Sequence, residues 1–160
     1  MSFSKAMTRD EKFMAEALRL SEQAMAHGNE PFGAVLVKDG EIVFTNENQI
    51  HTRHDPTFHG ELGLLRRFCE ETGITDLRDY TLYSSCEPCF MCSGAMVWTR
   101  LGRLVYGASN RQLESILGQE GSDCSAIVFS HSPHRPEVTA GVLQDACLRV
   151  LKDYFGPRAR

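Results

Sequence analysis

The chain of 160 residues lacks several features that mark particular classes of protein. No apolar run approaches the roughly 20 residues that a membrane-spanning helix needs. The opening residues, MSFSKAMTRDEKF, contain no apolar signal core, and the chain shows no internal repeat, low-complexity tract or linker. These absences predict one globular domain over residues 1–160, a cytoplasmic location and no membrane partner.

An excess of positive charge is missing as well. There are 17 Lys and Arg residues against 21 Asp and Glu residues, which gives a formal net charge of −4. Proteins that hold nucleic acid usually carry a clear surplus of Lys and Arg. The charge balance therefore argues against a nucleic-acid partner, although it leaves a local basic patch open.

Cysteine, in contrast, is plentiful, with six in the chain. A chain of this length can bury a core without disulfides, and nothing in the sequence signals export. We therefore expect reduced thiols. Three of the cysteines crowd into SSCEPCFMCSG, and this clustering points to chemistry rather than to packing.

The hydrophobic pattern alternates between helix and strand. Helical spacing from Met14 to Met25 ends at HGNEP, and GAVLVKDGEIVFTN predicts two strands joined at Asp39-Gly40. Further segments follow in order: a helix from about His59 to Glu71, a strand DYTLYSS, a helix after Pro88 to about Thr99, a strand GRLVYGAS, a short helix and loop RQLESILGQEGSD, a fifth strand AIVFS, and a final amphipathic helix TAGVLQDACLRVLKDYF. Alternation of this kind predicts an α/β fold with a mostly parallel sheet covered by helices on both faces.

Two helix starts carry residues that suit a metal. Cys89 and Cys92 share one face of a helix, and Pro88 suits its first turn. A helix N-terminus lowers the pKa of a thiol, and the thiolate is the form that binds metal. With His59 as a third ligand, one tetrahedral position stays open, which is typical of catalytic rather than structural zinc. Glu61 lies two residues further on, where it can handle a proton without ligating.

The two halves of this pattern differ greatly in specificity. For a chain of this composition, His-x-Glu is expected about 0.5 times by chance and Pro-Cys-x-x-Cys about 0.01 times. The alternative interpretation is a buried histidine with two inert thiols, and a glutamate that merely complements a helix dipole. The order of the two motifs, each opening a predicted helix, favours the zinc site.

HGE followed by PCFMC is the signature of the zinc nucleobase deaminases, and the chain resembles that superfamily, the cytidine deaminase superfamily. The segments PFGAVLVKDGEIV, DPTFHGE, LYSSCEPCFMCSGAMVW and RLVYGAS are similar to bacterial guanine deaminases. They also resemble bacterial tRNA adenosine deaminases and, more distantly, fungal cytosine deaminase. The resemblance covers about residues 10 to 110. It implies a three-layer α/β/α sandwich around a five-stranded mixed sheet, one Zn²⁺ per chain and a homodimer.

The resemblance also suggests residues that contact the substrate. Asn48 corresponds to the family's base-contacting asparagine, with a turn residue as the alternative. Gly60 replaces the alanine of most purine-type members, and Phe58 is larger than the alanine usual at its position. Both flank His59, so both are expected to shape the pocket.

Three further residues near the cysteine motif have competing interpretations. Cys86 is expected to be a thiol in the wall of the site rather than a fourth ligand. Trp98 either walls the pocket or packs in the core or a dimer interface. Glu87 is expected to be a helix-start residue rather than a catalyst.

The function predicted from these residues is zinc-dependent hydrolytic deamination of a free nucleobase, with guanine first and cytosine or a related amino-heterocycle second. Glu61 would carry the protons and ammonia would leave. Two other classes stay open: a tRNA adenosine-to-inosine deaminase, and a zinc-binding module without catalysis.

Overall fold

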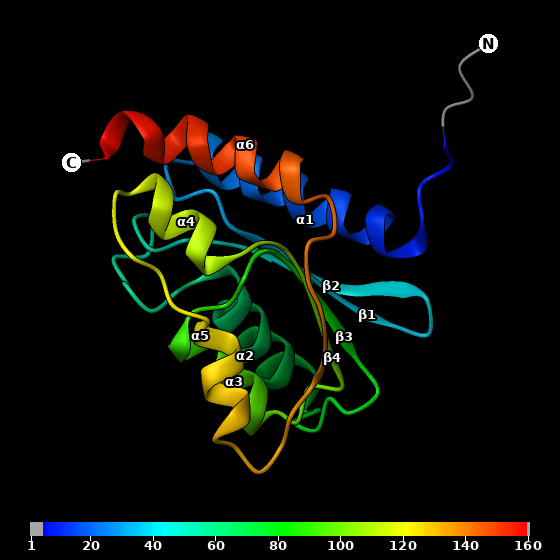
Figure 1. The fold of residues 1–160 in the computed structure, drawn as a ribbon. Helices are drawn as coiled ribbons and strands as arrows, with labels where there is room; N and C mark the ends of the chain where they lie inside the picture. The colour runs from blue at the N-terminus through cyan, green and yellow to red at the C-terminus, as the bar shows by residue number, and fades with distance from the viewer. Residues whose placement is uncertain (1–4, 160) are drawn as a thin grey trace.

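A computed structural model describes residues 5–159 of the chain (Figure 1). The helices are α1 (Arg9–Ala26), α2 (Gly60–Thr72), α3 (Phe90–Trp98), α4 (Asn110–Ile116), α5 (Cys124–Ser130) and α6 (Gln144–Phe155), followed by a 3₁₀ turn at Gly156–Arg158. The strands are β1 (Gly33–Lys38), β2 (Glu41–Glu47), β3 (Thr81–Cys86), β4 (Arg103–Ala108) and β5 (Glu137–Thr139).

The five strands form one mixed sheet in the order β2-β1-β3-β4-β5. Strand β1 pairs antiparallel with both β2 and β3, whereas β3, β4 and β5 run parallel. The expected five-stranded mixed sheet is confirmed. Strands β2, β3, β4 and β5 point the same way and β1 runs against them, so the sheet is mostly parallel in strand direction, as the alternation predicts.

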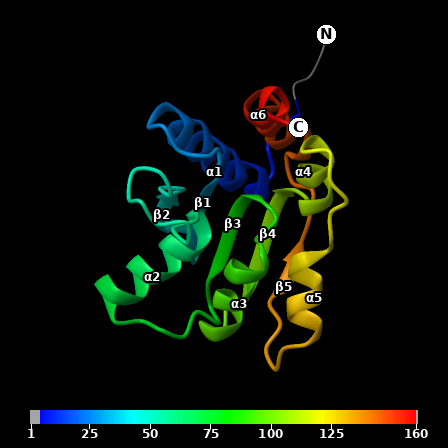
Figure 2. The same cartoon turned by 90° about the vertical axis from the view of Figure 1, so that its left-hand side faces the viewer.

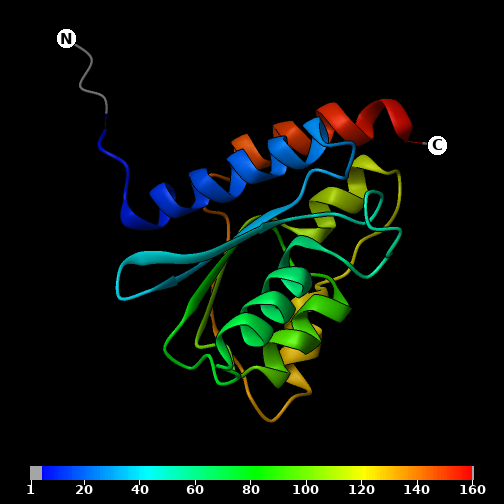
Figure 3. The ribbon, with the colours of Figure 1, turned by 180° about the vertical axis from the view of Figure 1, so that it is seen from behind.

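Helices cover both faces of the sheet, which confirms the expected α/β/α sandwich. Helices α1 and α6 lie on one face, and α2, α3 and α5 lie on the other (Figures 1 and 3). Two clusters of buried apolar side chains fill the spaces between the layers. One includes Leu36, Leu64 and Leu104 under α2 and α3, and the other includes Met14 and Val105 under α1 and α6.

Local sequence accounts for where the first elements begin and turn. Thr8 and Glu11 form a capping box that starts α1. The hairpin turns at Asp39 (φ 51°) and Gly40 (φ 77°), the pair of positive φ angles that favours Asp-Gly in a two-residue turn. The hairpin prediction is therefore confirmed.

The fifth predicted strand, AIVFS, is wrong. These residues belong to α5, which packs beside α3 and buries Cys124, Ser125 and Phe129 (Figure 2). A short apolar run fits a buried helix as well as it fits a strand, so periodicity alone cannot separate the two. The actual β5 is Glu137–Thr139 at the sheet edge, and α6 begins at Gln144, so the predicted start of the final helix at Thr139 is wrong.

The six cysteines are all free thiols, as the sequence predicts. Within residues 5–159, no helix combines the length and the apolar character needed to cross a membrane.

Candidate active site

The end of β3 meets the beginnings of α2 and α3, and the predicted ligands lie there. His59 is the N-cap residue of α2, and Cys89 is the N-cap residue of α3. The Cys89 sulfur accepts a hydrogen bond from the backbone N–H of Cys92 at 3.5 Å. Two helix N-termini therefore direct their positive ends toward one point, an arrangement that favours anionic thiolates.

The ligand atoms of His59, Cys89 and Cys92 all lie within 4.8 Å of one another. His59 Nδ1 is 3.7 Å from the Cys89 sulfur. Tetrahedral zinc with Zn–S near 2.3 Å and Zn–N near 2.0 Å separates two such ligands by about 3.6 Å. The donor set and its spacing therefore fit a zinc ion.

The thiols of Cys89 and Cys92 are not equivalent in their proton affinity. A hydrogen bond from the Cys92 thiol to the Cys89 sulfur lowers the pKa of Cys89 to about 4; burial opposes this shift and His59 adds to it. Donating that same bond raises the pKa of Cys92 well above its usual value, and burial adds to the effect. The surroundings of Cys89 thus favour its thiolate, the form of cysteine that binds metal.

Glu61 is buried beside these ligands, with 4 % of its surface exposed. Burial raises the pKa of its carboxyl group, and a hydrogen bond with Ser84 opposes this shift. The Ser84 hydroxyl is 2.7 Å from Glu61 Oε1 and 2.6 Å from the carbonyl oxygen of Cys86. A hydroxyl has one proton. It can donate to a charged Glu61, or donate to the carbonyl while accepting from a protonated Glu61, so Glu61 has a partner in both states.

Asn48 follows β2 and is 1 % exposed. Its backbone N–H donates to Phe32 O at 2.9 Å, and its side-chain oxygen accepts from the N–H of Ile50 at 3.1 Å. Its amide nitrogen, Nδ2, has no acceptor among residues 5–159 and keeps its donors free. A Cβ at Gly60 would lie 3.4 Å from Phe32 O and 3.7 Å from Asn48 N, so Gly60 lies against this loop.

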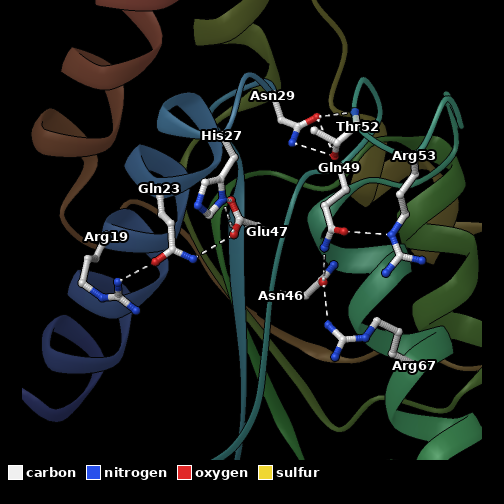
Figure 4. Close-up of polar contacts among 10 residues, drawn as sticks. All are labelled: Arg19, Gln23, His27, Asn29, Asn46, Glu47, Gln49, Thr52, Arg53 and Arg67. Carbon is white, nitrogen blue, oxygen red and sulfur yellow. Dashed lines mark hydrogen bonds and ion pairs between the residues drawn. The ribbon is translucent and has the colours of Figure 1, made fainter.

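Sequence reasoning missed a network of side chains that holds the loop before α2 (Figure 4). Asn46 is buried in β2, donates to Gly60 O at 2.9 Å and accepts from Arg67 at 3.1 Å. Asn29 accepts from the backbone N–H groups of His51 and Thr52 at 3.0 and 3.1 Å. An asparagine inside a predicted strand was the available signal, because asparagine is depleted in strands.

Three predicted site residues have surroundings that the sequence alone did not reveal. Trp98 ends α3, about 13 Å along the helix from Cys89, and is 88 % exposed. Cys86 is 2 % exposed and packs in the apolar cluster under α1 and α6. Phe58 packs under α2, where a Cβ at Gly63 would lie 2.7 Å from its ring. Regular alternation would put Cys86 on the face of β3 that holds Ser84, two residues earlier, so its packing under α1 and α6 departs from that pattern at the end of the strand.

A groove of about 300 Å³ opens beside Cys89 and Phe90. Its lining residues come mostly from α4, the start of α5 and the chain between them, and they are Cys89, Phe90, Asn110, Glu114, Gln119, Glu120, Gly121, Ser122 and Cys124. Two carboxylates are among them, and no Lys or Arg.

This fold, with histidine, two cysteines and a buried glutamate at two facing helix N-termini, defines a zinc-dependent deaminase. The chain belongs to the family described as the cytidine and deoxycytidylate deaminase zinc-binding region, which matches residues 7–108. It is accordingly a hydrolytic deaminase that uses zinc.

Individual relatives differ in their substrates. The chain is 34% identical to a tRNA-specific adenosine deaminase of Bacillus subtilis (strain 168) over 149 residues, 93% of the chain and 90% of the relative. It is 42% identical to a guanine deaminase of the same organism over 101 residues, 62% of the chain and 65% of the relative. A solved tRNA:A34 deaminase structure has a TM-score of 0.75 at 32% identity, covering 87% of this chain and 98% of that one.

Proposed function

We propose that this deaminase acts on a free nucleobase, with guanine first and cytosine or a related amino-heterocycle second. The observation that carries the proposal is the charge of the groove beside Cys89, where Glu114 and Glu120 are present without any Lys or Arg. Phosphates of a nucleic-acid strand are held by Lys and Arg and repelled by carboxylates. An uncharged base needs only a shaped pocket with a few polar groups.

His59, Cys89 and Cys92 would hold the zinc ion, which when bound activates a water molecule for attack on the amino-bearing ring carbon. Glu61 takes one proton from the attacking water and delivers it to a ring nitrogen. It then takes the proton of the hydroxyl group added to the ring carbon and passes it to the amine, which leaves as ammonia while the carbonyl forms. Its neighbour Ser84 changes the direction of its hydroxyl as the carboxylate gains and loses that proton. Proton carriers of this kind contribute roughly 10²–10⁴-fold to rate.

Asn48 orients the base in this proposal. Its side-chain oxygen is occupied by the N–H of Ile50, so the free Nδ2 group is the one that faces a ligand as a donor. A donor suits a ring carbonyl or an unprotonated ring nitrogen. A donor that the bound base covers rejects bases that lack the matching acceptor, because it would be left unpaired in the complex.

A second candidate, deamination of adenosine in tRNA, is favoured by two observations. The match to the tRNA-specific relative covers 93% of the chain and so includes much of the region after residue 110. In addition, Arg53, Arg66 and Arg67 line a second groove, of about 360 Å³, beside Phe58. That groove also contains Asp55 and Glu70, so its surplus of positive charge is small.

We also propose that the chain forms a homodimer through the outer side of α3. Phe90 is 52 % exposed and Trp98 is 88 % exposed on this helix, and Ile127 of the neighbouring α5 is 41 % exposed. Positions eight apart lie near one side of a helix. Large aromatic side chains gathered on one side of a short helix are typical of protein interfaces.

Ammonia release measured over a panel of substrates tests the substrate assignment. The panel contains guanine, cytosine, adenine, the matching nucleosides and a tRNA anticodon stem-loop. We expect turnover of guanine and little or none of the stem-loop. Inosine formation in the stem-loop, with no turnover of any free base, would establish the second candidate instead.

A further inference from the structure

Glu87 is a buried carboxylate that the proposed chemistry does not use. It lies between β3 and Cys89 and is 8 % exposed. No Lys, Arg or His among residues 5–159 forms an ion pair with it, so its charge is met by hydrogen bonds alone. A buried carboxylate without a cation is costly unless several donors surround it.

The donors to Glu87 come from the beginnings of two helices. Oε1 accepts from the backbone N–H of Asn110, the first residue of α4, at 3.0 Å. Oε2 accepts from the backbone N–H of Ser125 at 3.2 Å and from its hydroxyl at 2.5 Å, in the first turn of α5. The thiol of Cys124 is 3.8 Å from the same oxygen. The free N–H groups and positive ends of α4 and α5 thus both meet this carboxylate.

The residues between these helices are tied to one another as well. Asn110 Nδ2 donates to Ser122 O at 3.1 Å, and Arg111 forms an ion pair with Asp123 at 2.6 Å. Cys124 donates to Pro88 O at 3.2 Å. Residues 109–125 therefore form one unit, and Glu87 is its main polar attachment to the turn that carries Cys89.

This unit supplies most of the lining of the groove beside Cys89. The position of the groove wall relative to the metal ligand consequently depends on Glu87. We infer that Glu87 is a positioning residue that fixes the substrate wall formed by residues 109–125 against the zinc-ligand turn. The inference rests on the proposed function only in taking this groove as part of the substrate site.

Replacement Glu87→Gln tests the inference, because it keeps the shape of the side chain but places an NH₂ group where only acceptors fit. We expect about one zinc per chain, as in the parent. Hydrogen exchange of amides in residues 109–125 should be at least about tenfold faster, since opening of that unit becomes easier. On the panel substrate that the parent turns over, guanine in our proposal, KM should rise roughly tenfold to hundredfold with kcat within about threefold.

A matched pair at Asn110 isolates one hydrogen bond and serves if Glu87→Gln does not fold. Proline is tolerated at the first position of a helix, and Ser109 has the extended backbone (φ −84°, ψ 160°) that a following proline requires. Asn110→Pro deletes the N–H that Glu87 accepts, together with the side chain. Asn110→Ala deletes the side chain alone. We expect a higher KM and faster exchange in Asn110→Pro than in Asn110→Ala.

Glu41→Gln, an exposed carboxylate on the hairpin, is the unaffected control. Unchanged hydrogen exchange in residues 109–125 of Glu87→Gln would overturn the inference. Equal KM values and equal exchange rates in Asn110→Pro and Asn110→Ala would overturn it as well. Loss of zinc, or a fall in kcat at constant KM, would also overturn it by showing that Glu87 acts on the metal centre. Hydrogen exchange and zinc content are measured without substrate, so both tests of Glu87 remain valid even if guanine is not the substrate.

Discussion

At the scale of the residue, the pairing of Glu61 with Ser84 is what adapts a buried carboxylate to carrying protons. The hydroxyl lies within 2.7 Å of both Glu61 Oε1 and the carbonyl oxygen of Cys86, and it can reverse its role toward Glu61. Without it, the protonated and the charged carboxyl would each lose a hydrogen-bond partner at a buried position, where an unpaired polar group is costly.

Ser84→Ala should therefore lower kcat by roughly tenfold to hundredfold, because a hydrogen bond to a charged group is lost. Zinc content should stay at about one per chain. Ser84→Thr keeps the hydroxyl and should restore much of the rate. Equal activity in Ser84→Ala and the parent, measured by ammonia release, would show that Glu61 works without this hydroxyl.

Asn48 gives a second prediction at this scale, about recognition rather than proton transfer. Asn48→Ala removes the free Nδ2 donor, and kcat/KM for the true base should fall roughly hundredfold or more while zinc content is unchanged. Asn48→Asp is the matched variant, because it keeps the oxygen that accepts from Ile50 and lacks the donor. Normal kcat/KM in Asn48→Asp would mean that this side chain only shapes the loop.

At the scale of the element, one ion pair joins the first helix to the sheet. Asp10 of α1 accepts from Arg103 of β4 at 2.8 Å and 3.0 Å, and from the Tyr83 hydroxyl of β3 at 2.6 Å. The hydrogen bond from Arg103 holds the pKa of Asp10 below its usual value. A carboxyl group whose pKa is lower in the folded than in the unfolded protein stabilises the fold at pH values above its unfolded-state pKa. This stabilisation is lost as the pH falls through the folded-state pKa.

Asp10→Asn should accordingly lower the free energy of unfolding by about 1–3 kcal/mol at pH 7. The difference from the parent should shrink as the pH is lowered from 5 to 3, because the parent then loses the same charge. Urea unfolding of both proteins across this range measures it. If the free energies of unfolding of the two proteins differed by the same amount at every pH, the effect would come from the shape of the side chain rather than from its charge.

The sequence predicts most elements up to residue 110, because strong periodicity and turn residues mark them. It fails at AIVFS, where a run of five residues carries no period that separates strand from helix. The alternation of helix and strand also could not reveal that β3 lies beside β1 rather than beside β2, since strand order is set by how the chain crosses the sheet.

For the site, local signals were enough to predict the candidate ligands and Glu61, since each lies at a marked helix start. The directions of Phe58, Cys86 and Trp98 were not predictable, because adjacent positions differ in the face they present. Ser84 and Glu87 were missed as partners, since their contacts, to Glu61 and to Ser125, join residues 23 and 38 apart. Only the packed fold brings such pairs together.

At the scale of the whole molecule, the exposed side of α3 leads to a prediction about assembly. Light scattering at micromolar concentration should give the mass of a dimer for the parent. Trp98→Ala should shift that mass toward the monomer, because a large aromatic side chain often contributes several kcal/mol to an interface. Val43→Ala, an exposed apolar side chain of the edge strand β2, is the control. A monomer mass for the parent would refute the dimer.

The central claim, that a zinc centre and a buried proton carrier together perform deamination, is tested most directly by Glu61→Gln. Zinc per chain and ammonia release are measured on the same preparation, with the substrate that the panel identifies. The amide keeps the shape of the side chain but cannot carry the proton, so we expect about one zinc per chain and a rate lower by roughly 10²–10⁴-fold. Near-normal ammonia release from Glu61→Gln with its zinc in place would contradict the account.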